Sequence, residues 1–404
     1  MAIARKALEI VPQSLGQFEP RECIIGTRIR LGIQCGRIAE SATHRAPLCG
    51  LAGETMIRRR NLVMAGASLA AGQAIAIEAP DWEVVAPETG GLRAGDVADT
   101  LNAGASLPGL RALLVSHRGV LVAERYYAGA GPEDLQPINS ATKSVCSMLV
   151  GLALRDGRIK NLDETVAQLL PEATLEVPDS PARSVTLRQI LCGRSGLAFD
   201  PMHFGQLAAA KPLVRYALSR PAIPVAAPGW SYNDAMVALI APILARAQGA
   251  DLAVLAARDL FDLLGIQNFE WRRDRDGNPL APAGLTLRPR DLLKLSALMI
   301  EGGRWKGRQV LPESWVTQSL TPQGPATWRA GSVADVGYGL LWFTGRLQGH
   351  RVAWAWGYGG QFALLAPELK LVVATAATSP PPSALRQQTD AVMLLAGRMV
   401  QAAG

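Results

Sequence analysis

The chain has 404 residues, of which 49% are apolar and 19% charged, so it can bury a large core and is globular rather than disordered or fibrous. Its formal net charge is +7, but residues 1–76 hold ten Lys/Arg against five Asp/Glu, which leaves 31 against 29 for residues 77–404. No basic stripe with interleaved aromatic residues occurs in that larger part, so nucleic acid is disfavoured as a partner.

The N-terminal region predicts an export signal at residues 56–76. Arg58-Arg59-Arg60 precedes an apolar run at 62–71, and Ala74-Ile75-Ala76 has the small-x-small spacing of a signal-peptidase site. The arginines also resemble a twin-arginine signal. A short membrane anchor is the alternative, but the run is Ala/Gly-rich and shorter than the ~20 residues that a span needs. We therefore expect an exported, periplasmic protein with no stable membrane insertion after signal removal.

Residues 1–55 precede this signal, show no clear periodicity and hold three of the five cysteines. We interpret them as an upstream extension outside the fold, with the natural start at Met56. If Met1 is the true start, the signal is internal and a cytoplasmic location is expected instead. Residues 77–404 then form the functional domain.

Within this domain, the pattern predicts a sheet, a long helical part and a return to the sheet. Two apolar runs at 112–116 and 120–126 flank a turn and predict a hairpin. Residues 140–303 are mostly helical in pattern, and the sheet takes residues from about 110–135 and 337–404. In the second sheet region, strands at 362–365 and 371–375 are joined by Pro367-Glu368, and the tail from Ser383 to Ala403 predicts a helix.

Ser140-Ala141-Thr142-Lys143 stands at the start of an apolar run with helical spacing that ends at Asp156-Gly157. Positions i and i+3 share one face of a helix, so the Lys143 amine can lie beside the Ser140 hydroxyl and take its proton. This is the layout of a serine nucleophile that needs no histidine, placed where a helix N-terminus stabilises an oxyanion. Alone the spacing is weak evidence, because a capping serine followed by a surface lysine has the same pattern.

Two further motifs follow in the chain. Tyr232 lies at a loop-to-helix junction, where its phenol could be a second proton acceptor, and Asn233 or Asp234 is expected to cap the following helix. The alternative for Tyr232 is an ordinary half-buried tyrosine. Tyr358, Gly359 and Gly360 precede Gln361 and a strand; glycines there let the backbone approach a ligand and offer a free N–H. A glycine-rich bend between strands is the alternative.

Cysteine and histidine add little. A disulfide between Cys146 and Cys192 is one alternative in an oxidising compartment, but two buried thiols are favoured. The four histidines are scattered and show no metal-ligand spacing with cysteine, so no metal or organic cofactor is expected: His44, His117, His203 and His350. A Ser-His-Asp hydrolase is disfavoured, because no Gly-x-Ser-x-Gly elbow occurs.

From Leu110 to the C-terminus the chain resembles the penicillin-recognising serine hydrolases, in particular the class C β-lactamase-like branch that includes esterases and 6-aminohexanoate-dimer hydrolases. The resemblance rests on the motifs above and on several others in the same order, at Asp156-Gly157-Arg158-Ile159, Leu170-Pro171-Glu172, Val185 to Leu191, Ser195-Gly196-Leu197, Gly302 to Trp305 and Gly307 to Pro312. It implies an α+β, β-lactamase/transpeptidase-like fold, with an antiparallel sheet flanked by helices beside a mostly helical subdomain.

The resemblance implies that Ser140 attacks an acyl carbon, that Lys143 helps to deprotonate it, and that Tyr232 shuttles the proton to the leaving group. The N–H groups of Ser140 and Gln361 would form the oxyanion hole. Two departures bear on the substrate. The family asparagine two residues after the tyrosine is Asp234 here, and the family Lys-Thr-Gly appears as Tyr358-Gly359-Gly360 without the cation.

Both departures favour an esterase or amidase that acts on small uncharged acyl compounds, similar to the 6-aminohexanoate-dimer hydrolases. A β-lactamase or a D-alanyl-D-alanine carboxypeptidase is the enzymatic alternative. A non-catalytic binding protein on the same scaffold is a third possibility, because a fold does not fix a function. The sequence does not determine the oligomeric state.

Overall fold

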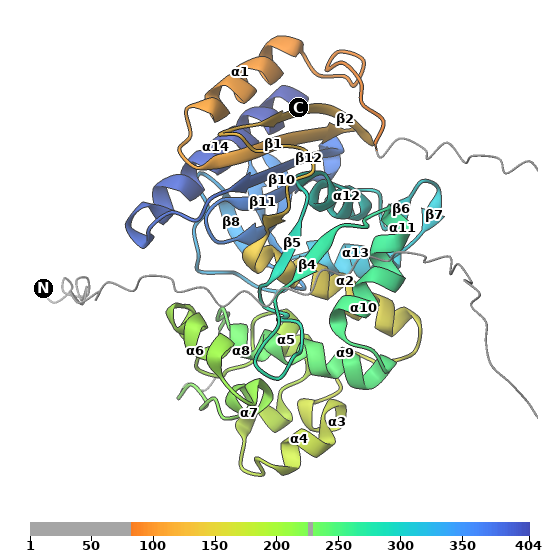
Figure 1. Cartoon of the computed structure of the whole chain (residues 1–404), viewed down its shortest axis with the longest axis vertical. Helices are drawn as coiled ribbons and strands as arrows, with labels where there is room; N and C mark the ends of the chain where they lie inside the picture. The colour runs from red at the N-terminus through yellow and green to blue at the C-terminus, as the bar shows by residue number, and fades with distance from the viewer. Residues whose placement is uncertain (1–81, 225–228) are drawn as a thin grey trace, which may run out of the picture.

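A computed structural model describes residues 82–224 and 229–404. The predicted extension at 1–55 and the predicted export signal at 56–76 lie outside these described residues. The described part has two sides, a layered α/β part and a mostly helical part, which are stacked along the long axis of the molecule (Figure 1). This is the β-lactamase/transpeptidase-like fold, as predicted.

The centre of the α/β part is an antiparallel sheet of seven strands in the order β2-β1-β12-β11-β10-β9-β8. The two predicted sheet segments are therefore interleaved, since β1 from the first pairs with β12 from the second. The bounds are β1 (Leu110–His117), β2 (Val120–Tyr126), β8 (Ala334–Tyr338), β9 (Phe343–Leu347), β10 (His350–Gly357), β11 (Gln361–Ala366) and β12 (Leu371–Ala377).

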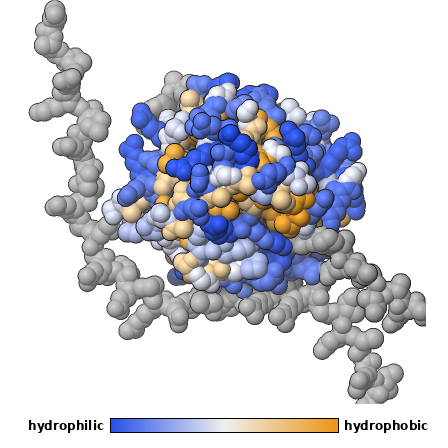
Figure 2. Space-filling view, turned by 90° about the horizontal axis from the view of Figure 1, so that it is seen from above, coloured by the Kyte–Doolittle hydropathy of each residue, from blue (hydrophilic) through white to orange (hydrophobic). Residues whose placement is uncertain are grey.

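Helices cover both faces of this sheet. On one face α1 (Ala94–Ala105) and the C-terminal α14 (Leu385–Ala403) pack against each other and onto the strands. On the other, α12 (Pro289–Ile300) packs against β1, β11 and β12. Seen from above, the molecule is mostly hydrophilic with separate apolar patches (Figure 2). The sequence pattern predicts that the helical part extends to about residue 303. Because α12 packs on the sheet, the helical part ends before residue 289.

The helical part contains short helices joined by loops. Its elements are α3 (Val166–Leu169), α4 (Pro171–Leu175), η2 (Pro181–Ser184), α5 (Leu187–Leu191), η3 (Pro201–His203), α6 (Phe204–Ala209), α7 (Leu213–Leu218), α8 (Asp234–Ala238), α9 (Ile240–Gln248), α10 (Leu252–Ala256), a π-helical turn η4 (Ala257–Phe261) and α11 (Asp262–Leu264).

Smaller elements join the two parts. They are a second sheet of β3 (Gln136–Pro137), β4 (Phe269–Trp271) and β5 (Leu285–Leu287), the ribbon of β6 (Arg304–Trp305) and β7 (Arg308–Gln309), and α13 (Glu313–Leu320). Within the described ranges no single helix is long and apolar enough to cross a membrane; only the bent pair Asp234–Gln248 and Leu252–Leu264, taken together, has that length and composition.

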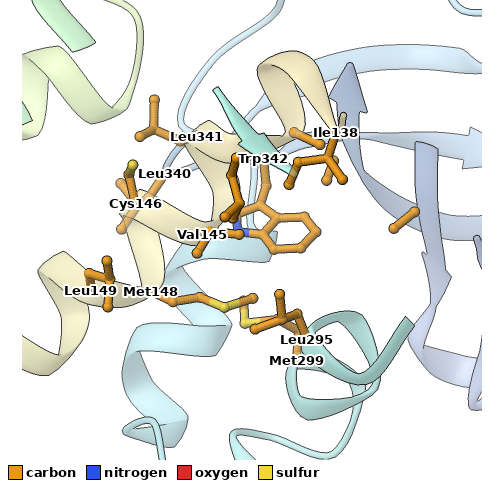
Figure 3. Close-up of a cluster of buried hydrophobic side chains, with 14 of the residues drawn as sticks. Ile138, Val145, Cys146, Met148, Leu149, Leu295, Met299, Leu340, Leu341 and Trp342 are labelled. Carbon is orange, nitrogen blue, oxygen red and sulfur yellow. The ribbon is translucent and has the colours of Figure 1, made fainter. Parts of the chain in front are cut away.

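Helix α2 (Thr142–Arg155) lies in the core between the two parts. All its residues from Thr142 to Ala153 are buried, so the apolar run of the sequence is a helix that is covered on every side. Val145 and Met148 of α2 surround the Trp342 indole together with Leu295 and Met299 of α12 (Figure 3). This packing fixes the N-terminal end of α2, where the serine of the Ser-x-x-Lys motif stands.

The local predictions that depend on short-range periodicity are confirmed. The hairpin is β1–β2, the two late strands are β11 and β12 joined by the turn η5 (Pro367–Leu369), and the tail is α14. The α2 helix ends at Asp156, followed by Gly157 in the left-handed region at φ 64°. Cys146 and Cys192 are both free and lie in buried positions, as the favoured alternative predicted.

Candidate active site

Ser140 belongs to a 3-10 turn, η1 (Asn139–Ala141), that runs directly into the N-terminus of α2. Asn139, the residue before it, has a positive φ of 47°, a conformation that non-glycine residues seldom adopt outside strained or functional positions. Its side chain donates a hydrogen bond to the Tyr358 carbonyl at 2.8 Å. The turn that carries Ser140 is therefore tied to the β10–β11 turn of the large sheet.

Lys143 lies one helical turn after Ser140 and points at it. Its Nζ is 3.0 Å from Ser140 Oγ, 2.7 Å from the Pro282 carbonyl oxygen and 2.6 Å from Asp234 Oδ1. Only 4% of the lysine side chain and 5% of the aspartate side chain are exposed. Burial lowers the pKa of the Lys143 ammonium, whereas the nearby charge of Asp234 raises it in part.

Tyr232 brings its ring to the same point from the loop before α8. The Lys143 ammonium lies 4.6 Å from the centre of the Tyr232 ring. Burial raises the pKa of the Tyr232 phenol well above its ordinary value, the charge of Asp234 raises it further, and a side-chain hydrogen bond with Ser140 lowers it. The phenol is thus protonated at neutral pH, and it lines the same cavity as Ser140.

Of the two residues after Tyr232, Asn233 caps helix α8 and Asp234 contacts Lys143. Asn233 is the N-cap of α8: its Oδ1 accepts the Met236 backbone N–H at 3.0 Å, and its Nδ2 donates to the Leu197 carbonyl at 2.9 Å. It is buried and is not among the described residues that line the cavity, so the contacts that the structure shows for it are those of a helix cap. Asp234, the first residue of the helix, faces Lys143 instead.

We expect Asn233→Ala to lower the free energy of unfolding by about 1–3 kcal/mol, since it removes a helix cap and leaves the Leu197 carbonyl buried without its donor. Urea denaturation measures this change. Asn233→Asp keeps the capping oxygen and should lose less stability than the alanine variant; an equal loss in both would contradict the assignment of a cap.

The glycine-rich turn between β10 and β11 approaches η1 closely. A Cβ built on Gly357 would lie 2.2 Å from the Ile138 carbonyl oxygen, so only glycine permits this approach. Tyr358, the next residue, lines the same cavity as Ser140. Gly359 and Gly360 adopt positive φ angles of 83° and 90°, which makes them the bend of the turn.

Gln361, whose backbone N–H is predicted to belong to the oxyanion hole, begins the strand that follows the glycine-rich turn. It starts β11 in register with Gly357, and its side chain is buried, with hydrogen bonds to both the backbone carbonyl and the N–H of Ala377. It is absent from the described residues that line the cavity. The backbone that borders Ser140 is that of Tyr358, three residues earlier, because the turn folds back before the strand begins.

Ser140, Tyr232 and Asp234 lie in a cavity of about 830 Å³, a size typical of small-molecule sites. Its wall is largely apolar and comes from separate segments: Pro201, Met202 and Phe204 from the helical part, Trp328, Trp356 and Tyr358 from the sheet side, and Pro382 and Leu385 at the start of α14. Arg329, Arg386 and Asp390 are the other charged residues that line it. In the described part of the chain, no group of three or more His, Cys, Asp or Glu has a metal-binding arrangement.

Sequence reasoning missed three contributors to this site. Trp328 stacks on Tyr232 with ring centres 4.3 Å apart and planes at 25°. Asn139 holds the Tyr358 carbonyl, and the Pro282 carbonyl accepts from Lys143. Asn139 could have been found from its place beside Ser140; no sequence signal marks Trp328 or a backbone carbonyl far along the chain.

Residues 96–398 match the family model named Beta-lactamase, so the chain belongs to the Beta-lactamase family, as the resemblance predicted. Among curated proteins, it is similar to a 6-aminohexanoate-dimer hydrolase of Paenarthrobacter ureafaciens, with 24% identity over 226 residues, which cover 52% of this chain and 56% of that protein. The chain thus spans little more than half the length of this relative.

Two solved structures show the same fold. A putative 6-aminohexanoate-dimer hydrolase from Bacillus anthracis superposes with a TM-score of 0.62 at 18% identity, over 76% of this chain and 82% of its own. A putative β-lactamase from Bacteroides dorei also gives a TM-score of 0.62, at 16% identity, over 76% of this chain and 97% of its own. At these identities, the structures show the fold alone.

Proposed function

We propose that the protein is a serine hydrolase that forms an acyl-enzyme on Ser140 and acts on small, uncharged esters or linear amides. The observation that carries this proposal is the meeting of three groups beside a large apolar cavity: the Ser140 hydroxyl and the Lys143 amine, one helical turn apart, and the Tyr232 phenol from a distant part of the chain. A nucleophile within hydrogen-bond reach of a base, with a second proton carrier beside it, is the arrangement that acyl transfer requires.

The steps follow from the geometry. The Ser140 proton moves to Lys143 as Oγ bonds to the acyl carbon, and the carbonyl oxygen takes the electron pair. Tyr232, kept protonated by its environment, donates its proton to the leaving group and recovers one from Lys143. Water then attacks the acyl-enzyme with the same groups acting in reverse, which releases the acid and restores the Ser140 hydroxyl.

We propose the N–H groups of Ser140 and Tyr358 as the oxyanion hole, in place of Ser140 and Gln361. Ser140 stands where a 3-10 turn enters the positive end of α2, and Tyr358 lines the cavity beside it. The hydrogen bond from the Asn139 side chain to the Tyr358 carbonyl holds the η1 turn and the β10–β11 turn, which carry these two N–H groups, next to each other. One such preorganised donor typically lowers the barrier by about 2.7–4 kcal/mol.

The charges at the reacting centre favour a neutral acyl group, whereas Arg329, Arg386 and Asp390 line other parts of the cavity. Asp234 compensates the Lys143 ammonium at 2.6 Å, so the reacting centre presents no net positive charge to a substrate carboxylate. The turn that carries Lys-Thr-Gly in β-lactamases supplies no cation here. Aromatic and aliphatic side chains form most of the remaining wall, which suits an apolar acyl chain or leaving group.

A substrate panel tests this proposal. We expect measurable turnover of p-nitrophenyl butyrate or of a short linear amide, and no stable covalent capture of a fluorescent penicillin. Capture or hydrolysis of the penicillin with no ester or amide turnover would establish the β-lactamase or carboxypeptidase alternative instead. No reaction with any of the three would favour a binding protein.

We expect Tyr232→Phe to lower kcat for p-nitrophenyl butyrate by about 10²–10⁴-fold, the usual contribution of a positioned acid or base. The aromatic ring and its stacking on Trp328 are kept, so the substitution removes only the phenolic hydroxyl. Tyr338→Phe is the matched control, because Tyr338 is a buried neighbour in the same aromatic cluster but does not line the cavity. Equal loss in both variants would assign the effect to packing rather than to proton transfer.

A further inference from the structure

The surroundings of Lys143 Nζ hold this nitrogen within reach of Ser140. The nitrogen has three oxygen neighbours from three separate elements: Asp234 Oδ1 of α8 at 2.6 Å, the Pro282 carbonyl at 2.7 Å and Ser140 Oγ of η1 at 3.0 Å. A carbonyl oxygen accepts hydrogen bonds and never donates one, and the same holds for a carboxylate. The Pro282 carbonyl therefore fixes one N–H direction, whereas Asp234 forms a close, buried ion pair with the nitrogen without hydrogen-bond geometry.

The direction toward Ser140 is the one that changes with protonation. An ammonium has three hydrogens and donates one of them to Ser140 Oγ. A neutral amine can still donate to the Pro282 carbonyl, and the loss of one proton frees an electron pair on a nitrogen that lies 3.0 Å from the serine oxygen. The site thus holds the basic nitrogen within reach of Ser140 in either protonation state.

Asp234 has two separable effects in this arrangement. Its oxygen, 2.6 Å from Nζ, helps to hold the nitrogen in place, and its negative charge favours the ammonium over the amine. Asparagine, the residue that the related family pattern has at this position, would supply the acceptor without the charge. The other titratable groups around this pair are the Tyr232 phenol, the Cys146 thiol of α2 and the Tyr338 phenol of β8, and burial raises the pKa of each. They are neutral near neutral pH, so Asp234 is the charged group that acts on Lys143 there.

We propose that Asp234 is a positioning residue that aims Lys143 at Ser140 and, through its charge, shifts the active range of this enzyme toward alkaline pH. The inference rests on the proposed function, since it concerns the step in which the Ser140 proton moves to the Lys143 lone pair while Oγ bonds to the acyl carbon. That step needs the neutral amine. The charge of Asp234 therefore sets how alkaline the medium must be before the amine is present.

The pH dependence of kcat/KM for p-nitrophenyl butyrate, read after quenching at one common pH, tests this. In Asp234→Asn the acid limb should move to lower pH by about 1–3 units, the usual effect of an opposite charge at this range. Asp234→Ala also loses the acceptor, so kcat at its optimum should fall about tenfold or more below that of Asp234→Asn. Asp390→Asn removes another carboxylate that lines the same cavity but pairs with the Gly331 N–H instead of Lys143, and it should leave the acid limb in place.

The rate of Ser140 labelling by a fluorophosphonate, measured across the same pH series, gives a second readout that needs no turnover. The same downward shift in Asp234→Asn is expected, and this variant decides the matter even if Asp234→Ala fails to fold. An unmoved acid limb in Asp234→Asn, with an active wild type, would overturn the role of the charge and leave the proposed function standing. A wild type that neither turns over ester nor is labelled at Ser140 would overturn the proposed function and this inference with it.

Discussion

Replacing Ser140 with alanine should lower the turnover of a neutral ester by at least about 10³-fold, because removal of a serine nucleophile leaves only what substrate binding and the oxyanion donors supply. The structure gives a specific reason to expect so large a loss. Ser140 Oγ is hydrogen-bonded to Lys143 Nζ at 3.0 Å and lines the same cavity as Tyr232, so the nucleophile and both proton carriers meet at this residue. Initial rates with p-nitrophenyl butyrate measure the effect.

Stability is not expected to account for this loss. The Ser140 side chain is partly exposed to the cavity, so the alanine variant should unfold within about 1 kcal/mol of the wild type. Ser379→Ala, which removes another hydroxyl from the cavity wall, is the matched control and should still be labelled by a fluorophosphonate at Ser140. An alanine variant at position 140 that retained most of its turnover would show that the reaction takes place elsewhere.

Lys143→Met should lower the free energy of unfolding by about 3–5 kcal/mol, the usual result of leaving one partner of a buried ion pair without its counter-charge. Here both side chains are almost fully buried, so water reaches the stranded Asp234 carboxylate poorly. Urea denaturation measures this loss.

The double variant Lys143→Met/Asp234→Asn separates the charge from the loss of packing. With no carboxylate left to strand, it should recover at least about 2 kcal/mol of the stability lost in Lys143→Met. Both variants lack the amine and should be catalytically inactive, so the second change should raise stability without restoring activity. Equal stability of the single and double variants would mean that the Lys143–Asp234 pair carries no buried charge.

The parts of the fold that the sequence predicted are those with a local cause. Apolar spacing and flanking turn residues were enough to predict the β1–β2 hairpin, α2, the late strand pair and α14. The position of α12 could not be predicted in this way, because its amphipathic pattern is the same whether it packs on a sheet or among other helices. The interleaving of β1 with β12 likewise depends on contacts between the two ends of the domain.

In the candidate site, too, contacts within one helix could be predicted from the sequence, whereas contacts between distant segments could not. Ser140 and Lys143 are one helical turn apart, so their contact follows from helix geometry. Tyr232 and Asp234 could be named from motifs, but the 2.6 Å contact of Asp234 with Lys143 requires α8 to pack beside α2. Gln361 was favoured because it follows the glycines, yet the bend at Gly359 and Gly360 places Tyr358 at the cavity instead. Trp328 contributes to the site by stacking on Tyr232, and no sequence pattern around residue 328 predicts this contact.

The central claim is that Ser140 is an activated nucleophile, and mass spectrometry of the protein after reaction with a fluorophosphonate tests it most directly. Peptide mapping should find one phosphonylated residue, Ser140, with the modification absent in Ser140→Ala and strongly slowed in Lys143→Met. Modification of a different serine, or none under conditions that label a known serine hydrolase to completion, would contradict the account.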